Sequence, residues 1–222
     1  MTAKRRVARR SEPLSRERIV GAAIDILDAE GETALTFRAL AARLATGSGA
    51  IYWHVSDKDA LLAESTEAIV APVMAAGDRN TDPRAAIRAI ASGLFDAIDA
   101  RPWVGTQLAR APWQPAMLHI FTGIGIQFEA MDIPEQAQFD CGSALVSYIL
   151  GAATQNAANA RLRPPGTDRS ALLEAIAAEW TEKDCATHPF VQRFAARLRD
   201  HDDREQFLAG VDLILAGIDA LG

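Results

Sequence analysis

The sequence contains only two cysteines, Cys141 and Cys185, in 222 residues. Two cysteines cannot make the disulfide framework of a small secreted domain, and the cytosol would keep them reduced. Apolar residues make up 49% of the chain, yet no run approaches the roughly 18 apolar residues needed to span a bilayer. We therefore expect a protein that does not interact with membranes and that resides in the cytoplasm.

The motifs of several enzyme classes are also missing. No Ser-His-Asp set, carboxylate pair or glycine-rich phosphate loop stands in a suitable context. Gly123-x-Gly125 lies inside a helical segment rather than after a strand, so it is not a dinucleotide fingerprint. Cys185 and His188 are spaced like two metal ligands, but without a second pair they indicate a surface turn before Pro189. We expect no enzyme activity, no cofactor and no metal.

The charge is small overall but unevenly spread. A net charge of −6 and a pI near 5.3 argue at first against a nucleic-acid partner. Residues 1–18, however, contain seven basic and two acidic residues, whereas residues 61–222 contain 13 basic and 21 acidic residues. This asymmetry predicts a basic arm before an acidic body. The start MTAKRRVARR resembles that of a signal peptide, but SEPLSRERIV has no apolar region, so we expect none.

Helical periodicity dominates the rest of the chain. Stretches rich in Ala, Leu and Ile are separated by Pro and Gly, without the alternation of strands, which predicts an all-α fold. Ser15 and Thr36 are expected to cap the first two helices, and Ser56-x-x-Asp59 resembles a capping box for the fourth. The expected helices cover residues 16–30, 37–44, about 47–54, 56–76, 84–100, 103–110, 115–130, 134–160, 169–182, 188–199 and 203–220.

The stretch TGSGAIYWHV, residues 46–55, places tiny residues directly before bulky rings. Two short helices joined by a tight break, after a longer helix and a basic arm, form a helix-turn-helix pattern. A recognition helix enters a major groove about 12 Å wide, so its outer face needs small residues. Two glycines cost a short helix roughly 1 kcal/mol each relative to alanine, which stability alone does not explain. The alternative is that residues 46–50 form a flexible loop.

The side chains around this stretch suggest two faces. We expect Ile51 and Val55 to point inward toward Leu40 and Leu44, with Trp53 packed beside them. The outer side chains would contact phosphates, with base reading by Arg38, Ser48 and the Ala50 methyl group. The basic arm would track phosphates or a minor groove, unless it is only a solvated tail. The predicted contacts to double-stranded DNA are Arg5, Arg6, Thr36, Arg38, Gly47, Ser48, Ala50, Tyr52, His54 and Lys58.

The segment LTFRALAARLATGSGAIYWHVSDKDALL resembles the DNA-binding signature of the tetracycline-repressor (TetR) family of transcriptional regulators. The residues in register with that signature are Thr36, Leu40, Ala41, Ile51, Tyr52, His54, Val55 and Lys58. One departure lies in the turn, which often carries Gly before an apolar residue and here has Ala45-Thr46. The resemblance implies a DNA-binding domain over residues 15–62, after an arm of residues 1–14, and a regulatory domain over residues 63–222.

The resemblance further implies a homodimer with a four-helix bundle and a cavity for a small-molecule effector. Residues 134–160 and 203–220 have apolar side chains on more than one helical face, and these side chains would form the dimer face. The glycines that would permit close approach are Gly142, Gly151, Gly210 and Gly217. Alternatively, the apolar side chains form the core of a single chain. A pocket needs mostly apolar walls with a few polar groups, although aromatics are more often core. The pocket candidates are Trp103, Trp113, His119, Phe121, Phe128, Tyr148, Gln155, Asn156 and Asn159.

These features predict a ligand-released repressor that binds a palindromic operator as a homodimer. Two alternatives remain open. The first is an activator, or a regulator whose effector promotes DNA binding. The second is a helical enzyme or carrier of a hydrophobic small molecule, with an N-terminal unit that docks a protein.

Overall fold

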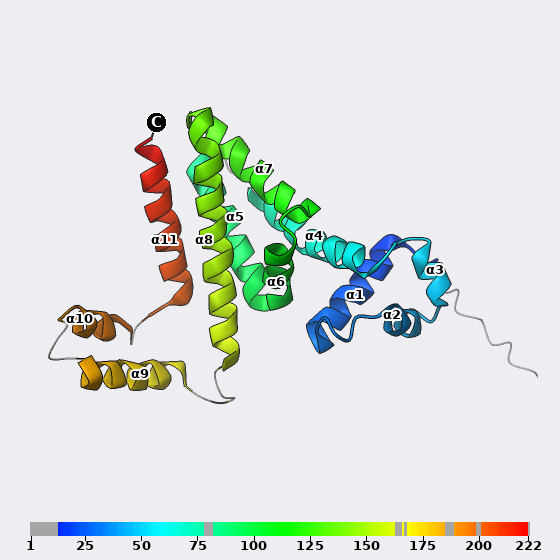
Figure 1. Ribbon diagram of the computed structural model, residues 1–222, viewed down its shortest axis with the longest axis horizontal. Coiled ribbons are helices and arrows are strands. Elements are labelled where there is room, and N and C mark those ends of the chain that lie inside the picture. The colour runs from blue at the N-terminus through cyan, green and yellow to red at the C-terminus, as the bar shows by residue number, and fades with distance from the viewer. Residues whose placement is uncertain are drawn as a thin grey trace, which may run out of the picture. The chain divides into compact units, whose positions relative to one another are not determined.

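The computed structural model describes residues 13–77, 82–162, 166, 168–184, 189–198 and 201–221, with residues 181–184 described by their backbone only. Over these residues the chain forms helices and no strand (Figure 1), which confirms the all-α prediction. The helices are α1 (Arg16–Glu30), α2 (Phe37–Arg43), α3 (Ser48–Tyr52), α4 (Lys58–Gly77), α5 (Pro83–Ala100), α6 (Pro102–Arg110), α7 (Pro115–Ala130), α8 (Glu135–Leu162), α9 (Arg169–Asp184), α10 (Pro189–Leu198) and α11 (Asp203–Asp219).

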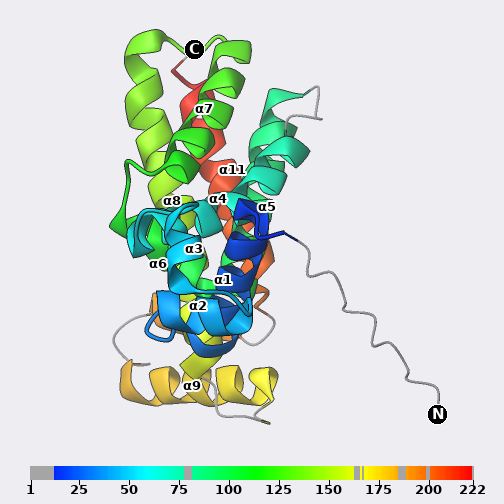
Figure 2. The ribbon, with the colours of Figure 1, turned by 90° about the vertical axis from the view of Figure 1, so that its right-hand side faces the viewer.

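The chain divides into two compact units, and the boundary follows Ala68. The first unit contains α1, α2, α3 and the start of α4, and its three N-terminal helices lie together (Figure 2). Its core is aliphatic, because each helix contributes residues at helical spacing that are withdrawn from water. The fully or almost fully buried side chains are Ile19, Ala23, Ile26, Leu27, Leu35, Leu40, Ile51, Val55, Leu61 and Leu62.

Two of the N-caps predicted for this unit are present in the structure, and the third is not. The Ser15 hydroxyl accepts from the backbone N–H of Arg18, and the Thr36 hydroxyl accepts from that of Ala39, as predicted. The capping box at Ser56 was wrong. Asp57 caps α4 instead, because its carboxylate accepts from the N–H of Ala60, while the Ser56 hydroxyl donates to that carboxylate. These bonds lower the pKa of Asp57.

The break between α2 and α3 depends on an alanine in an uncommon conformation. Ala45 has φ of 51°, in the left-handed region that glycine occupies most readily. The backbone N–H of Thr46 donates to the carbonyl of Ala41 at 2.9 Å, which closes the last turn of α2. Ala45-Thr46 departs from the family pattern but still forms the sharp turn. The cost is backbone strain at Ala45.

The second unit has one aliphatic and aromatic core, built mainly from α5, α7, α8 and α11. Among its members are Leu145, Ile149 and Ala153 of α8, and Phe207, Val211, Leu215 and Ile218 of α11. The assignment of these residues to a dimer face was wrong, because they fill the core of their own chain. Gly142 also faces inward, toward Phe121 and Phe128, whereas a Cβ at Gly151 or Gly217 would meet no described atom within 4 Å.

Helix α11 runs beside both α5 and α8 (Figure 1). Three ion pairs join it to α5: Arg84–Asp219, Arg88–Asp212 and Arg204–Asp96. The first two arginines come from α5 and the third from α11, so the sign of the charges reverses along the contact. Exposed pairs of this kind contribute at most about 1 kcal/mol each, so they fix alignment more than stability.

Gly210 of α11 lies close to Tyr148 of α8. The hydroxyl of Tyr148 lies against its Cα and donates to the carbonyl of Phe207 at 3.0 Å. Burial raises the pKa of Tyr148, which keeps this hydroxyl protonated as a donor. The Tyr148 ring is also stacked on that of Phe207, with centroids 5.7 Å apart.

Helix α4 has 20 residues and a mean hydropathy of 1.3 over its most apolar 18 residues, so its length and composition would allow it to cross a membrane. This differs from the sequence-based expectation that no segment would qualify. The helix supplies buried side chains to the protein, including Leu61, Leu62, Val70 and Met74. Because 39% of that window is buried, packing accounts for part of its apolar character.

We expect Ala45→Gly to raise the free energy of unfolding of the first unit by about 0.5–1 kcal/mol. Glycine removes most of the left-handed strain, and its larger loss of chain entropy offsets only part of that gain. Urea unfolding of the purified protein measures the change. The control is Ala42→Gly, on the exposed side of α2, which should lower stability by about 1 kcal/mol. If both variants lost equal amounts of unfolding free energy, the left-handed conformation of Ala45 would be contradicted.

We expect Gly210→Ala to destabilise the second unit by about 1–3 kcal/mol, a typical cost of overpacking. The added Cβ would overlap the hydroxyl oxygen and the Cζ of Tyr148, so the ring must move. Thermal unfolding monitored by circular dichroism reports the loss. Gly125→Ala is the matched control, because its Cβ would meet no described atom within 4 Å and should stabilise α7 by up to about 1 kcal/mol. A neutral Gly210→Ala would refute the close packing.

Candidate nucleic-acid interface and ligand pocket

The outer surface at the start of α3 carries only small side chains, as the sequence suggests. Gly47, Ser48 and Gly49 are exposed, Ala50 is half-buried, and a Cβ at either glycine would meet no described atom within 4 Å. Ile51 and Val55 lie on the opposite side, fully withdrawn from water. Residues 48–52 are helical, so the alternative of a flexible loop over residues 46–50 does not fit. The tiny residues are therefore held in place and open to a partner.

The rings beside α3 differ from the expected arrangement. Tyr52 is stacked on Phe37, the first residue of α2, with centroids 4.2 Å apart and an interplanar angle of 5°. It is still 54% exposed, so it both packs and faces outward. The expectation that Trp53 packs beside Ile51 and Val55 was wrong, because Trp53 is 89% exposed. An indole this exposed next to a bare helix is available for contact with a partner.

The other predicted contact residues lie in several places on the first unit. Thr36 and Arg38 are exposed at the start of α2, where Thr36 also serves as the cap. His54 is half-buried in the turn after α3. The Lys58 ammonium donates to the carbonyl of Glu32 at 2.8 Å, which ties the start of α4 to the loop after α1. An ammonium group has three donors, so this bond leaves capacity for a phosphate.

Arg5 and Arg6, together with the rest of the predicted basic arm, lie outside the described residues, as do Cys185 and His188. Within the described part of the chain, no group of three or more His, Cys, Asp or Glu side chains is arranged to hold a metal ion.

The second unit contains a pocket of about 480 Å³ between α5, α8 and α11. One end is aromatic: Phe207 stacks on Phe95 with centroids 4.7 Å apart, and Tyr148 follows on its other side. The wall continues along α8 through Gln155 and Asn156. Apolar walls with a few placed polar groups are typical of ligand sites.

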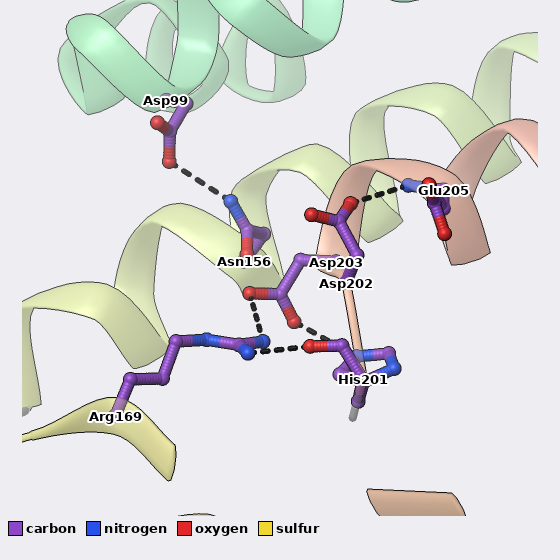
Figure 3. Close-up of polar contacts among 7 residues, drawn as sticks. All are labelled: Asp99, Asn156, Arg169, His201, Asp202, Asp203 and Glu205. Carbon is purple, nitrogen blue, oxygen red and sulfur yellow. Dashed lines mark hydrogen bonds and ion pairs between the residues drawn. The ribbon is translucent and has the colours of Figure 1, made fainter. Parts of the chain in front are cut away.

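The polar end of this pocket is organised by ion pairs and hydrogen bonds (Figure 3). Arg169 donates to Asp203 at 2.7 Å and to the backbone carbonyl of His201, and His201 Nε2 lies 2.9 Å from the same carboxylate. Asn156 donates to Asp99 at 2.8 Å. The charges of Arg169 and Asp203 offset each other, so hydrogen bonding dominates this end of the pocket.

The structure brings together only part of the predicted ligand set. Tyr148, Gln155, Asn156 and Asn159 line the pocket between α5, α8 and α11. Phe121 and Phe128 line a separate, mainly apolar hollow of about 270 Å³ between α7 and α8. The remaining candidates line neither cavity: Trp103 packs partly buried against the core, Trp113 is 82% exposed, and His119 is half-buried on α7.

Several residues that line the pocket were not predicted from the sequence, among them Phe95, His201, Asp203 and Gln206. Phe95 is a core position on α5, which helical spacing alone cannot distinguish from its neighbours. Asp203 is the first residue of α11 and His201 lies two residues before it, and both come more than 40 residues after Tyr148 and Asn156. Their approach depends on the tertiary fold. The only local signal was a cluster of polar residues around the N-cap of α11.

Comparison with known proteins agrees with this arrangement. Residues 19–65 match the family described as "Bacterial regulatory proteins, tetR family". The chain is 50% identical to the transcriptional regulator SCO7222, a TetR from Streptomyces coelicolor, with a TM-score of 0.86 over 94% of this chain and 99% of that one. It is 28% identical to an HTH-type transcriptional regulator of Saccharopolyspora erythraea, over 76% of this chain and 72% of the relative.

A more distant structure shares the fold. The TetR family protein ActR of Streptomyces coelicolor, solved in complex with actinorhodin, is 22% identical, with a TM-score of 0.76 over 95% of this chain and 100% of that one. The half-identical relative spans nearly the whole chain, and the family match covers the helix-turn-helix described above. This chain therefore belongs to the TetR family of transcriptional regulators.

Proposed function

We propose that the protein is a ligand-responsive repressor that binds a palindromic DNA operator as a homodimer in the cytoplasm. The observation that carries the proposal is the exposed run Gly47–Ala50, backed by the buried Ile51 and Val55. A surface of this shape fits a major groove, and two copies would occupy successive grooves about 34–36 Å apart. The resemblance of Tyr52–Val55 to the tetracycline repressors supports repression rather than activation.

The proposed contacts divide by role. Arg38, Ser48 and the Ala50 methyl group would contact base edges, while Tyr52, His54 and Lys58 would contact phosphates. Thr36 would add a phosphate contact beside its capping bond, the open backbone at Gly47 would approach the groove, and Arg5 and Arg6 would extend the contact along the DNA. The structure adds Trp53 to this proposal, because its indole lies beside the bare face of α3 and is almost fully exposed.

The dimer is proposed to form through the exposed faces of α8 and α11. Residues 141–160 contain no charged residue over 20 positions, although α8 has a solvent-exposed side along this whole stretch. Surface helices of soluble proteins usually carry charges on such a face. On α11 the exposed side carries Ala209, Leu213, Ala216 and Gly217, together with Glu205 and with Asp212, which is paired with Arg88. These faces suit a two-fold interface in which the same patch of each copy meets.

The effector is proposed to bind between α5, α8 and α11. Aromatic side chains at one end and amide groups at the other favour a compact ligand with rings and hydrogen-bonding groups, and without a strong net charge. The actinorhodin complex of ActR shows that this fold can hold a small molecule. Preference of the effector for the conformation that cannot bind DNA, by about 1–3 kcal/mol, would suffice for release. No chemistry on the ligand is needed.

Selection of bound duplexes from a random pool tests the proposal directly. We expect an inverted repeat whose half-sites are about one helical turn apart. If the protein retains no duplex, or only single half-sites, the proposal of a dimeric DNA-binding repressor fails.

With the selected duplex, Trp53→Ala should weaken binding about tenfold or more, as expected for removal of an exposed aromatic anchor. The melting temperature should stay unchanged, because the indole packs on almost nothing. Fluorescence anisotropy measures the dissociation constant. Trp113→Ala is the matched control, since Trp113 is equally exposed but lies in the second unit, and it should not affect DNA binding. Tyr52→Ala is less diagnostic, because Tyr52 also packs on Phe37.

Deletion of residues 1–10 should weaken operator binding and flatten its dependence on salt. The segment contains Lys4, Arg5, Arg6, Arg9 and Arg10. Each phosphate that the shortened chain no longer neutralises should reduce the slope of log K against log salt by about 0.9. Titrations at four or more salt concentrations determine the slope. An unchanged slope would show that the arm does not contact DNA.

A further inference from the structure

The pocket between α5, α8 and α11, the effector pocket, has a neighbour between α8 and α9. This α8–α9 hollow has a volume of about 360 Å³. Leu172, Leu173 and Ile176 line it from α9, and all three are half-buried. Ala160 and Leu162 line it from α8. The apolar part of its wall is thus aliphatic, whereas stacked aromatic rings form one end of the effector pocket.

The two cavities share a stretch of wall. Asn156 and Asn159 of α8 and Asp203 of α11 line both of them. The two asparagines are three residues apart and therefore lie on the same side of α8, which forms a continuous polar wall from one cavity to the other. Asn156 donates to Asp99, but an amide has two donor hydrogens and an acceptor oxygen, which leaves groups for a ligand.

The contact between Arg169 and Asp203 lies where the two cavities meet (Figure 3). Arg169 lines the α8–α9 hollow, and its guanidinium donates to Asp203 and to the backbone carbonyl of His201, which lines the effector pocket. The side chains of Arg169 and Asp203 are 33% and 43% exposed. Ion pairs that water reaches to this extent contribute little free energy, so a ligand can displace the arginine at low cost. The contact is therefore a movable partition rather than a fixed wall.

We infer that the effector site extends from the effector pocket into the α8–α9 hollow. The effector is then an uncharged molecule whose ring system is joined through a polar group to an alkyl chain. This inference rests on the proposed effector site. The ring system would stack at the aromatic end, the polar group would meet Asn156 and Asn159, and the alkyl chain would lie along α9. An alkyl chain suits the hollow better than a second ring, because none of the described residues along its wall is aromatic.

A homologous series of N-alkyl-2-naphthamides, from methyl to hexyl, tests the extension. These uncharged probes carry the ring system, the hydrogen-bonding group and the chain in the inferred order. Isothermal titration calorimetry on the full-length protein gives the dissociation constant of each probe. We expect the methyl amide to bind in the effector pocket. Each added methylene should then tighten binding roughly fourfold, the factor expected for burial of a methylene, until the hollow is filled.

Variants of the hollow show where the chain lies. Ala160 is exposed and lines the hollow, so Ala160→Phe should narrow the hollow with little change in melting temperature. We expect it to weaken binding of the hexyl amide about tenfold or more and to leave the methyl amide unchanged. Ala175→Phe is the matched control, because Ala175 is exposed on α9 and lines neither cavity. It should leave both dissociation constants unchanged.

A second variant makes the test independent of added volume. Leu173→Asn places a polar group on the wall of the hollow from α9, which is not part of the proposed dimer face. It should reduce the gain in affinity per methylene without affecting the methyl amide, because the chain would lie against a polar wall. Sedimentation velocity should give one oligomeric state for the wild type and all three variants.

The outcomes separate the inference from the proposed effector pocket. If the methyl amide binds but chain length has no effect, the extension is overturned and the effector pocket stands. Equal losses of hexyl amide binding in Ala160→Phe and Ala175→Phe would place the chain elsewhere and overturn the extension as well. If no member of the series binds, the effector pocket and its extension fail together. Loss confined to the hexyl amide in Ala160→Phe and Leu173→Asn would support the extended site.

Discussion

Anchoring of the five-residue helix α3 is the constraint on which the DNA-binding surface depends. Isolated helices shorter than about 12 residues are marginal in water, so α3 must be held by tertiary contacts. Ile51 and Val55 provide them from behind, and the stack of Tyr52 on Phe37 joins α3 to the start of α2. Because these contacts fix the helix, its outer positions are free to be Gly and Ser. The surface can then be shaped for a groove rather than for stability.

The positions of the helices could be predicted from the sequence because their signals are local. Caps such as Ser15 and Thr36, and breaks at Pro and Gly, set the ends within a few residues. The direction of single side chains was harder. Trp53 was placed inside because it is apolar, although a position two residues after Ile51 points to the other side of a helix. Helical geometry was the better guide there than hydrophobicity.

The core and the proposed dimer face could not be separated from the sequence, because both require apolar residues. On α8 and α11 the large aliphatic residues, such as Leu145 and Leu215, fill the core of the same chain. The signal for the proposed interface is instead the absence of charge along residues 141–160, whose exposed side includes Gly151. The pocket was less predictable still, because Phe207 reaches Tyr148 across 59 residues of sequence.

Helix α11 links these features physically. Its inner side contributes Phe207 to the core and to the wall of the pocket, and its start is tied to α9 through Arg169 and Asp203. Its outer side carries Leu213. A ligand that displaces the Phe207 ring must either shift α11 or force Tyr148 from its position against Gly210, because close-packed cores do not deform continuously. Either movement alters the side of α11 that a second copy would meet, so in the proposed dimer effector binding and association would be energetically coupled.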